Sequence, residues 1–395
     1  MNLLHIAMND PNAPTGGLGV ALHHITRHQA AQHRVVVLCV NEEREQGADD
    51  DDGRRIICAD LTQLDISGVD MAYHQRAWQA LGLALCQRLR HETFDVIHLH
   101  DSWLWPVAQQ ARAMFGCPVV YTHHLSFLSE NIGWQGWNRV SSQEARLEAA
   151  VIRECYHTFV SHAYARRINT LFAMDKLMPH RPCAVIANGV DSDTINLAPA
   201  VDISALAAGR VPVYFCGRLV ESKGIRLVLE AARALPTHHF FMFCRIGHDH
   251  KDCTALSREI NAVSYLLDNI SWFHDAAIGS QFGYLKSCSL ALVPSLNHAP
   301  FEITALEAMA ARVPLITTAL CGLSDFCHED NADICAPTAE GLIAAIAGHV
   351  RSNERVERAY ATASYYSWPR AAEDYINFYR SLPYARPDLP SRYAA

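Results

Sequence analysis

The chain has 395 residues, which is too long for one ordinary hydrophobic core and suits two domains of about 200 residues each. Its apolar and charged fractions, 50% and 19%, are those of a soluble globular protein and exclude a disordered or fibrous chain. The formal net charge of −8 argues against a general nucleic-acid-binding surface.

Short β-branched or aliphatic runs alternate with longer amphipathic segments along the whole chain. This alternation predicts an α/β protein with parallel sheets covered by helices on both faces. Strands are expected at residues 3–8, 34–40, 96–100, 118–122 and 158–161, and then at 211–216, 239–244, 270–273, 290–294 and 313–317. The acidic stretch 45–52 is expected to be a solvated loop, because consecutive carboxylates repel one another and lack the alternating spacing of metal ligands.

Residues 178–197 contain prolines, a glycine and an asparagine that interrupt helical periodicity, so they are expected to link the two domains. Residues 1–7 lack the basic region and long apolar run of a signal peptide, and no run of about 18 apolar residues follows. A cytoplasmic protein is expected, with peripheral membrane contact left open. The 13 cysteines are scattered singly, without disulfide-framework or zinc-site spacing, and most are expected to be small buried hydrophobes.

Two glycine-containing turns precede expected helices. Thr15-Gly16-Gly17-Leu18-Gly19 follows the first strand, and it lacks the spacing of the dinucleotide-binding fingerprint. Its glycines either let backbone amides approach a ligand or only make a tight turn. Gly217-Arg218 ends the first strand of the second half, and Lys223-Gly224 follows before an amphipathic helix. This pair of cations is suited to neutralise a diphosphate leaving group; a solvated loop is the alternative.

A carboxylate stands among apolar residues in the second half, where Glu307 is flanked by Leu306 and Ala308. Burial of that carboxylate requires hydrogen-bond donors, which a sugar diol supplies, unless Glu307 lies on a solvated helix face. Polar side chains also gather at the ends of the first-half strands, namely His98, His100, Asp101, His123 and His124. Ligands collect at such strand ends in open α/β sheets. A zinc site and ordinary structural histidines are the alternatives.

Taken in order, these motifs resemble the GT-B glycosyltransferases, in particular the retaining enzymes of glycosyltransferase family 4, a group that includes glycogen synthase-like and phosphatidylinositol mannosyltransferase-like enzymes. The resemblance spans almost the entire chain. Besides the segments named above, it is carried by Asp95-Val96-Ile97-His98-Leu99-His100-Asp101, Asn188-Gly189-Val190-Asp191, Leu306-Glu307-Ala308-Met309-Ala310 and Ser367-Trp368.

The resemblance implies two Rossmann-like domains that face each other across a deep cleft. It places an acceptor-side domain at 1–188, a nucleotide-sugar-binding domain at 189–366, and a helical segment at 367–395 that packs back on the first domain. The implied activity is that of a hexosyltransferase (EC 2.4) that moves a sugar from a UDP-, GDP-, ADP- or TDP-sugar to an acceptor hydroxyl with retention, and requires no metal and no further cofactor.

The resemblance also assigns roles by position. Arg218 and Lys223 correspond to the pair that grips the donor diphosphate, Glu307 to the carboxylate on the donor ribose, and His124 to a histidine near the transferred sugar. These cations and His124 are the expected catalytic residues, and Gly16 and Gly17 are expected to line the diphosphate site. The expected acceptor-side residues are Asp101, His123 and Trp134. In the loop 126–137, the aromatic residues Phe127, Trp134 and Trp137 either stack on an acceptor or form a hydrophobic lid.

The chain departs from the family pattern at Ala299, where the family has a glutamate. Glu302, His298, Asn297 and Phe301 are the nearby candidates for donor contacts. On a regular helix Glu302 and Glu307 would not share a face, so Glu302 compensates only if the loop is rearranged. Arg312 and Cys321 also replace glycines of the family. Two alternatives therefore stand beside the transferase: a catalytically degenerate nucleotide-sugar-binding protein and a GT-B-shaped sugar-nucleotide epimerase. The donor's base and sugar, the acceptor (glycan, lipid, protein or small molecule) and the oligomeric state stay open.

Overall fold

The computed structural model describes residues 1–14, 16–41, 48–60, 71–130, 139–178, 180–245, 250–274 and 279–383. The chain folds into two compact units. Unit 1 comprises Met1–Ala187 and the chain from Pro369 onward, and unit 2 comprises Asn188–Trp368. The division falls inside the expected linker, but that segment is not all irregular, because it contains β8 (Cys183–Val185) and α8 (Ser192–Leu197).

Unit 1 is built on an eight-stranded sheet with the order β3-β4-β2-β1-β5-β6-β7-β8. Its other strands are β1 (Asn2–Ala7), β2 (Arg34–Asn41), β3 (Ala48–Asp51), β4 (Arg54–Asp60), β5 (Val96–Leu99), β6 (Val119–His123) and β7 (Tyr156–Phe159). All neighbours are parallel except β3 and β4, which pair antiparallel. The expectation of a loop over the acidic stretch was therefore wrong for residues 48–51, because pairing with β4 satisfies their backbone groups.

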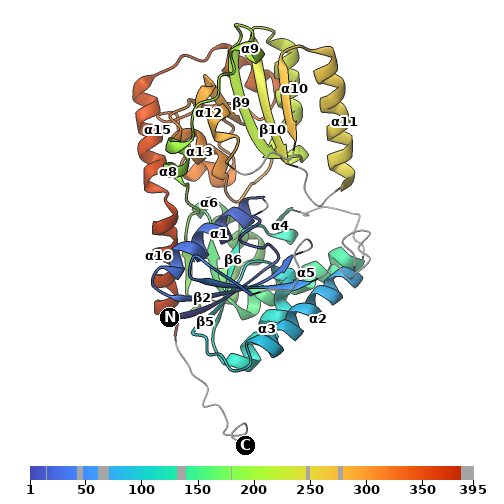
Figure 1. Ribbon diagram of the computed structural model, residues 1–395, viewed down its shortest axis with the longest axis vertical. Helices are drawn as coiled ribbons and strands as arrows, with labels where there is room; N and C mark the ends of the chain where they lie inside the picture. Colours follow the sequence, from blue (N-terminus) through green and yellow to red (C-terminus); the bar gives the residue numbers. More distant parts are fainter. Residues whose placement is uncertain are drawn as a thin grey trace, which may run out of the picture. The chain divides into compact units, whose positions relative to one another are not determined.

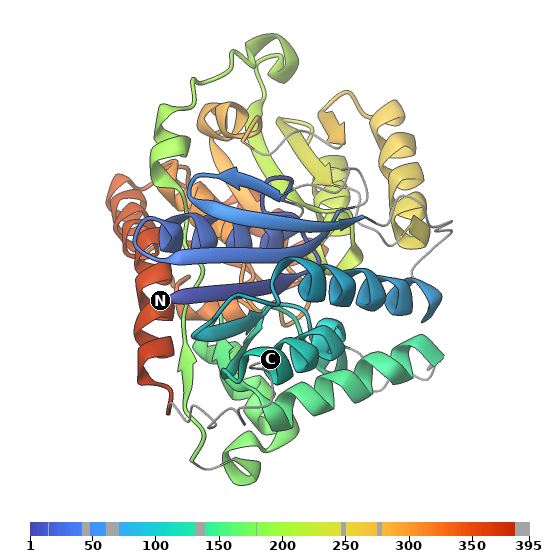
Figure 2. The same cartoon turned by 60° about the horizontal axis from the view of Figure 1, so that its bottom comes forward.

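Helices cover both faces of this sheet. They are α1 (Gly16–Ala30), α2 (Met71–Arg88), α3 (Trp105–Phe115), α4 (Phe127–Glu130), α5 (Arg139–Glu154), α6 (His162–Phe172), α7 (Met174–Leu177) and α16 (Trp368–Ser381). Leu4 and Ile6 of β1 share a hydrophobic cluster with α2, α3 and α5, and α2 and α5 run along one side of the sheet in Figure 2. Successive side chains of a strand point to opposite faces, so His5 lies on the other face, where its partner Gln29 comes from α1.

Unit 2 is built on a six-stranded parallel sheet with the order β11-β10-β9-β12-β13-β14. Its strands are β9 (Val211–Arg218), β10 (His238–Arg245), β11 (Ile270–His274), β12 (Leu290–Val293), β13 (Leu315–Thr317) and β14 (Asp333–Ile334). Its other helices are α9 (Ser204–Ala207), α10 (Ile225–Ala234), α11 (His250–Leu266), α12 (Phe282–Ser287), α13 (Ile303–Ala310), α14 (Ala339–Ala347) and α15 (Asn353–Tyr365). Figure 1 shows β9 and β10 side by side, with α10 and α11 alongside.

The alternation of buried side chains along β9 explains the two layers of unit 2. Tyr214 packs into a cluster with α13 and α15, whereas Val213 and Phe215 pack into a second cluster with α10, α11 and α14. Two sheets, parallel except for the β3–β4 pair and each covered by helices on both faces, confirm the expected Rossmann-like α/β class. Within the parts of the chain that the structure describes, no helix is both long and apolar enough to cross a membrane.

The cysteines agree in part with their expected role. The side chains of twelve of them are described, and all twelve are free thiols. Seven are buried, namely Cys39, Cys58, Cys117, Cys155, Cys244, Cys288 and Cys327, whereas Cys86 and Cys183 are exposed. Most of these thiols therefore act as small core residues.

Candidate functional site

In each sheet the strand order reverses direction at one point, and crevices that bind ligands form outside the carboxyl ends of strands at such points. In unit 2 the reversal lies between β9 and β12, since β10 and β11 extend to one side and β13 and β14 to the other. In unit 1 it lies between β1 and β5, which carry β2 and β6 on their far sides. The residues that follow these four strands are therefore the first to consider.

Three cations gather where β9 and β10 end. Arg218 is the last residue of β9, and its register partner on β10 is Arg245. Arg218 is exposed. Lys223 follows in a short 3₁₀ turn, and its stem lies against Gly217, where an added Cβ would be 3.5 Å from Lys223 Cγ. Arg245 was not identified from the sequence, in which its signal is that it ends a strand, as Arg218 does.

The backbone beside these cations requires glycine at position 224. Gly224 has a left-handed φ of +73°, and an added Cβ would lie 2.1 Å from the carbonyl oxygen of Pro294. The turn after β12 thus packs directly against the start of α10. Helix α10 begins at Ile225, so the positive end of its dipole adds to the cations of the preceding turn. The arrangement is suited to bind an anion.

Lys223 has a carboxylate partner from the next loop. Its Nζ lies 2.5 Å from Oε1 of Glu302, and Ser295 Oγ donates to the same oxygen at 2.6 Å. Glu302 is 5% exposed and is the N-cap of α13, with extended backbone angles (φ −126°, ψ 94°). Helical geometry therefore does not apply to Glu302, and the angular separation of Glu302 from Glu307 on a regular helix does not exclude a contribution from it. Ala299, at the position of the family's glutamate, is buried.

Glu307 lies in α13, and burial raises its pKa to about 7, with the Arg245 guanidinium opposing part of that rise. This carboxyl group thus changes its charge near neutral pH. The remaining candidates on the loop differ in their surroundings. His298 is exposed. The ring of Phe301 packs near those of Phe326 and Tyr366, with centroid distances of 5.1 and 6.2 Å.

In unit 1 the turn after β1 is held to the end of β5. Asp101 Oδ2 accepts a hydrogen bond of 2.8 Å from the backbone N–H of Met8. Burial raises the pKa of Asp101 to about 6, and this hydrogen bond opposes the rise. Further along the same turn Gly16 has a φ of +65° and begins α1, and Gly17 is exposed. The glycine turn follows β1 and Asp101 follows β5, so both lie beyond the carboxyl ends of two neighbouring strands.

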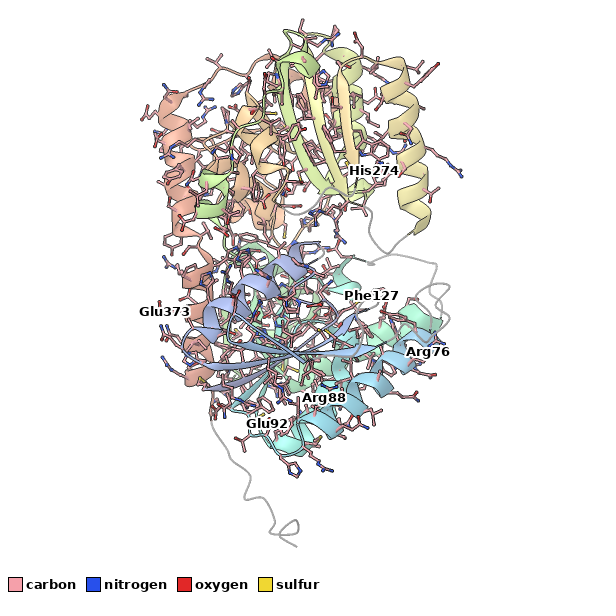
Figure 3. All side chains as sticks on the ribbon, viewed as in Figure 1. Arg76, Arg88, Glu92, Phe127, His274 and Glu373 are labelled. Carbon is pink, nitrogen blue, oxygen red and sulfur yellow. The ribbon has the colours of Figure 1, made fainter. Side chains whose placement is uncertain are left out.

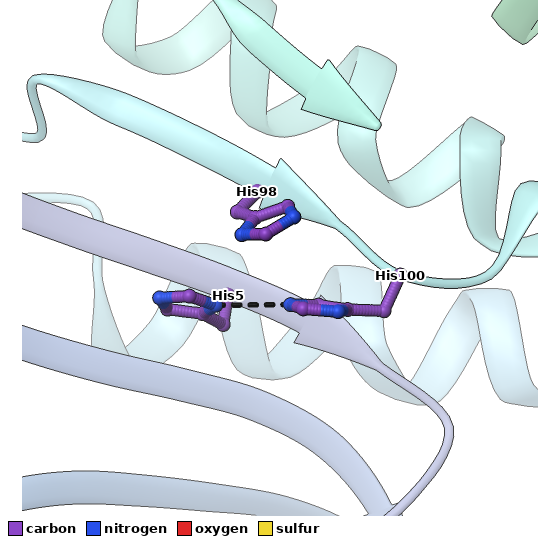
Figure 4. Close-up of side chains that lie close together, drawn as sticks. All are labelled: His5, His98 and His100. Atoms are coloured by element: carbon purple, nitrogen blue, oxygen red, sulfur yellow. Dashed lines mark hydrogen bonds between the residues drawn. The ribbon is translucent and has the colours of Figure 1, made fainter. Parts of the chain in front are cut away.

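The histidines of unit 1 form a hydrogen-bonded line. His5 Nδ1 lies 3.0 Å from His100 Nε2, as Figure 4 shows, and His100 Nδ1 lies 3.1 Å from His124 Nε2. His5 was not identified from the sequence, although a lone histidine in an apolar strand is a signal. His98 stands beside this line, with its Nδ1 2.6 Å from the hydroxyl of Tyr379 and its Nε2 2.6 Å from Thr122 Oγ1.

Zinc binding is an alternative for these histidines, because ring nitrogens of His5, His98 and His100 lie within 4.8 Å of one another. Both nitrogens of His98, however, face hydroxyl groups. The 3.0 Å contact of His5 with His100 is a hydrogen-bond distance, shorter than the ~3.4 Å between two nitrogens bound tetrahedrally at ~2.1 Å from zinc. The geometry favours a hydrogen-bonded cluster. A second buried group joins Cys39 Sγ and Cys58 Sγ at 3.5 Å, and Cys58 Sγ and Asp10 Oδ2 at 3.8 Å.

The expected acceptor-side residues do not all join His124. His123 is fully buried, and its Nε2 lies 3.1 Å from Nδ1 of His157, so it faces the interior. Phe127, labelled in Figure 3, is partly buried and begins α4. Trp134 and Trp137 lie outside the described residues.

Two protein-family models match successive parts of the chain. The Glycosyltransferase Family 4 model matches residues 15–194, and the Glycosyl transferases group 1 model matches residues 210–352. Together with the fold, these matches define a glycosyltransferase (EC 2.4) of the kind that uses nucleotide sugars. The chain belongs to the GT-B glycosyltransferases of family 4.

Two proteins of Mycobacterium tuberculosis are similar to this chain in sequence. Over 381 residues the chain is 28% identical to the glycogen synthase of Mycobacterium tuberculosis, with 88% of this chain and 85% of that protein covered. It is 22% identical to the phosphatidyl-myo-inositol mannosyltransferase of the same organism, covering 74% of this chain and 75% of that one.

Two solved structures show the same fold. A sucrose-phosphate synthase from Thermosynechococcus elongatus has a TM-score of 0.79 at 16% identity and covers 96% of this chain and 98% of its own. Anabaena HepE, solved in complex with UDP-glucose, has a TM-score of 0.74 at 17% identity and covers 97% of this chain and 100% of its own.

Proposed function

We propose that the chain transfers a hexosyl group from a nucleoside-diphosphate sugar to an acceptor hydroxyl with retention of anomeric configuration, and that unit 2 binds the donor. The observation that carries this proposal is the cation cluster of Arg218, Arg245 and Lys223 at the carboxyl ends of β9 and β10. Family membership supports the retaining outcome.

The cations stabilise the charge that develops on the departing diphosphate. The Arg218 guanidinium is exposed and can bind phosphate oxygens bidentately. The Lys223 ammonium has three N–H donors, so it can keep its bond to Glu302 and still donate to phosphate. Glu302 thus orients Lys223, which is the contribution we assign to it in place of the missing carboxylate at Ala299. The N-terminus of α10 adds its dipole.

The proposal gives each of the other assigned residues a role of its own. Glu307 accepts hydrogen bonds from the donor ribose in its ionised form, and Arg245 beside it favours that form. His124 contacts the transferred sugar, and the amides of Gly16 and Gly17 contact the diphosphate, as the family resemblance implies. Asp101 lies on the acceptor side. HepE was solved with UDP-glucose, so UDP-hexoses are the first donors to test.

The test combines binding with turnover. A thermal-shift panel of nucleoside diphosphates and their sugars identifies the donor, because a ligand at about 100 times its Kd adds ~2.7 kcal/mol of stability. With that donor, Arg218→Ala and Lys223→Ala are each expected to lower turnover by ~10²-fold, as for the loss of ~3 kcal/mol of charge stabilisation. The anomeric configuration of the product, read by NMR, tests retention.

A matched control is available at the start of α10, directly after the turn that holds Lys223. Arg226 is exposed and pairs with Glu221 and Glu259 at 2.8 Å each, so Arg226→Ala removes an arginine close to the cluster without removing a proposed phosphate contact. It is expected to retain near-normal turnover. Near-normal turnover of Arg218→Ala or Lys223→Ala would remove that residue from the mechanism.

A further inference from the structure

Four hydrogen-bonded side chains of unit 1 form a continuous line that runs from helix α1 across the neighbouring strands β1, β5 and β6. Gln29 of α1 lies next to His5 of β1, with 2.9 Å between Gln29 Oε1 and His5 Nε2. From His5 the line continues to His100, after β5, at 3.0 Å between ring nitrogens, and Figure 4 shows this contact. From His100 it continues to His124, after β6, at 3.1 Å. It therefore joins the interior to a residue of the proposed site.

All three imidazoles of this line are neutral near pH 7. Burial lowers the pKa of His5 to about 4 and the pKa of His124 to about 4. Burial also lowers the pKa of His100 well below its usual range, and the neighbouring histidines add to that effect. A neutral imidazole has one N–H donor and one acceptor nitrogen, so each ring can donate on one side only.

The first member of the line fixes the direction of every later hydrogen bond. In the structure the amide of Gln29 presents its carbonyl oxygen to His5, and a carbonyl oxygen only accepts. With this amide orientation His5 carries its proton on Nε2 and accepts at Nδ1. His100 must then donate from Nε2 and accept at Nδ1. His124 in turn donates from Nε2. The lone pair of His124 is thereby left on Nδ1. The opposite tautomer would require three rings and the Gln29 amide to change together.

We propose that Gln29 is a positioning residue that sets the tautomer of His124 through His5 and His100. This inference rests on the proposed function, because it uses the assignment of His124 to the transferred sugar. His124 then presents an acceptor nitrogen, and the group it recognises is a sugar hydroxyl that donates a hydrogen bond. A fluorine in place of that hydroxyl cannot donate and is rejected.

The test reads the tautomer directly. The full chain is labelled with ¹⁵N-histidine, and the two ring nitrogens of His124 are assigned by the signals that disappear in His124→Asn. Their ¹⁵N shifts show which nitrogen carries the proton. A proton on Nε2 in the wild-type protein is expected, and a proton on Nδ1 would overturn the proposal. This measurement requires neither turnover nor a variant of Gln29.

Variants of Gln29 test the cause. Gln29→Met keeps the length of the side chain but removes the acceptor, so the His124 signals are expected to move toward a mixture of tautomers and transfer to slow by about tenfold. Gln29→Glu restores an oxygen acceptor and should restore both. Thr158→Val removes a different buried hydrogen bond of this sheet, 2.6 Å to Thr122, and should change neither.

The possible outcomes separate the two proposals. An unchanged tautomer in Gln29→Met overturns the role of Gln29 whatever the activity. A changed tautomer with unchanged transfer overturns the link to the reaction. If no sugar nucleotide is turned over by the wild-type protein, the proposed function fails, and the NMR result still decides how the tautomer is set.

Discussion

The ion pair between Lys223 and Glu302 permits a double-mutant cycle that tests the central feature of the donor site. The side chains of Lys223 and Glu302 are 18% and 6% exposed, and their charged atoms lie 2.5 Å apart. Lys223→Met leaves a buried carboxylate without its cation. Glu302→Gln leaves a largely buried ammonium without its anion. The double variant Lys223→Met/Glu302→Gln removes both charges and leaves similar volumes.

The expected magnitudes follow from burial. Removal of one partner of a buried pair costs ~3–5 kcal/mol, and because Ser295 still donates to Glu302 at 2.6 Å, we expect about 3 kcal/mol for Lys223→Met. For a unit of this size that corresponds to a Tm lower by ~6–12 °C. The double variant should recover much of the loss, with a coupling free energy of ~2 kcal/mol.

The assay is scanning calorimetry or denaturant unfolding of the four proteins without ligand. The exposed pair Arg226 and Glu221, whose side chains are 48% and 50% exposed, provides a parallel cycle in which coupling below ~1 kcal/mol is expected. If the losses of the Lys223 and Glu302 variants simply add, the two groups do not hold one another, and the explanation for the missing carboxylate at Ala299 is refuted.

Three further predictions follow from single groups. Because burial raises the pKa of Glu307 to about 7, its ionised form is lost on acidification, so calorimetric affinity for a sugar nucleotide should fall by ~5–10-fold from about pH 8 to about pH 6; a Glu307→Gln variant with the same pH dependence would contradict this. Gly224→Ala places a Cβ 2.1 Å from the carbonyl oxygen of Pro294 and should lower the free energy of unfolding by more than ~2 kcal/mol. The control is Gly209→Ala, where φ is +80° and no atom lies within 4 Å of the added Cβ, and it should cost only the ~1 kcal/mol of a left-handed alanine. Equal losses in the two variants would rule out the clash. Burial lowers the pKa of His5 from 6.5 to about 4, so the free energy of unfolding should be fully present above pH 6.5 and should fall as the pH approaches 4, by up to ~3 kcal/mol in urea unfolding. A His5→Phe variant whose free energy of unfolding falls with pH as steeply as that of the wild-type protein would refute this.

Local patterns were sufficient for the strands that carry the sites. The apolar runs of β1, β9, β10 and β12 were predicted to within two residues of their observed bounds, because buried parallel strands are marked by their own composition. The strand β3 was not predicted, since four residues of sequence Ala-Asp-Asp-Asp have no strand propensity of their own. Only the antiparallel partner β4 makes that segment a strand.

Some site residues were likewise evident from local sequence, whereas the roles of others depend on tertiary contacts. Arg218 and Lys223 were identified because they flank a turn between a strand and a helix. Arg245 was missed, because its position beside Arg218 is a matter of register between β9 and β10. For Glu302 the sequence left the outcome conditional on the conformation of its loop, and the structure has it as the N-cap residue of α13 in an extended conformation, from which it reaches Lys223.

The sequence by itself determined the class of this protein, because periodicity, turn glycines and charged residues at strand ends are properties of short segments. It also determined the family, since the motifs keep their order along the chain. The tertiary structure decided which residues act together. Glu302 meets Lys223 across 79 positions of sequence, and Gln29, His5, His100 and His124 form one line across neighbouring elements. Such contacts depend on strand order and register, which bring distant residues together and leave no local mark in the sequence.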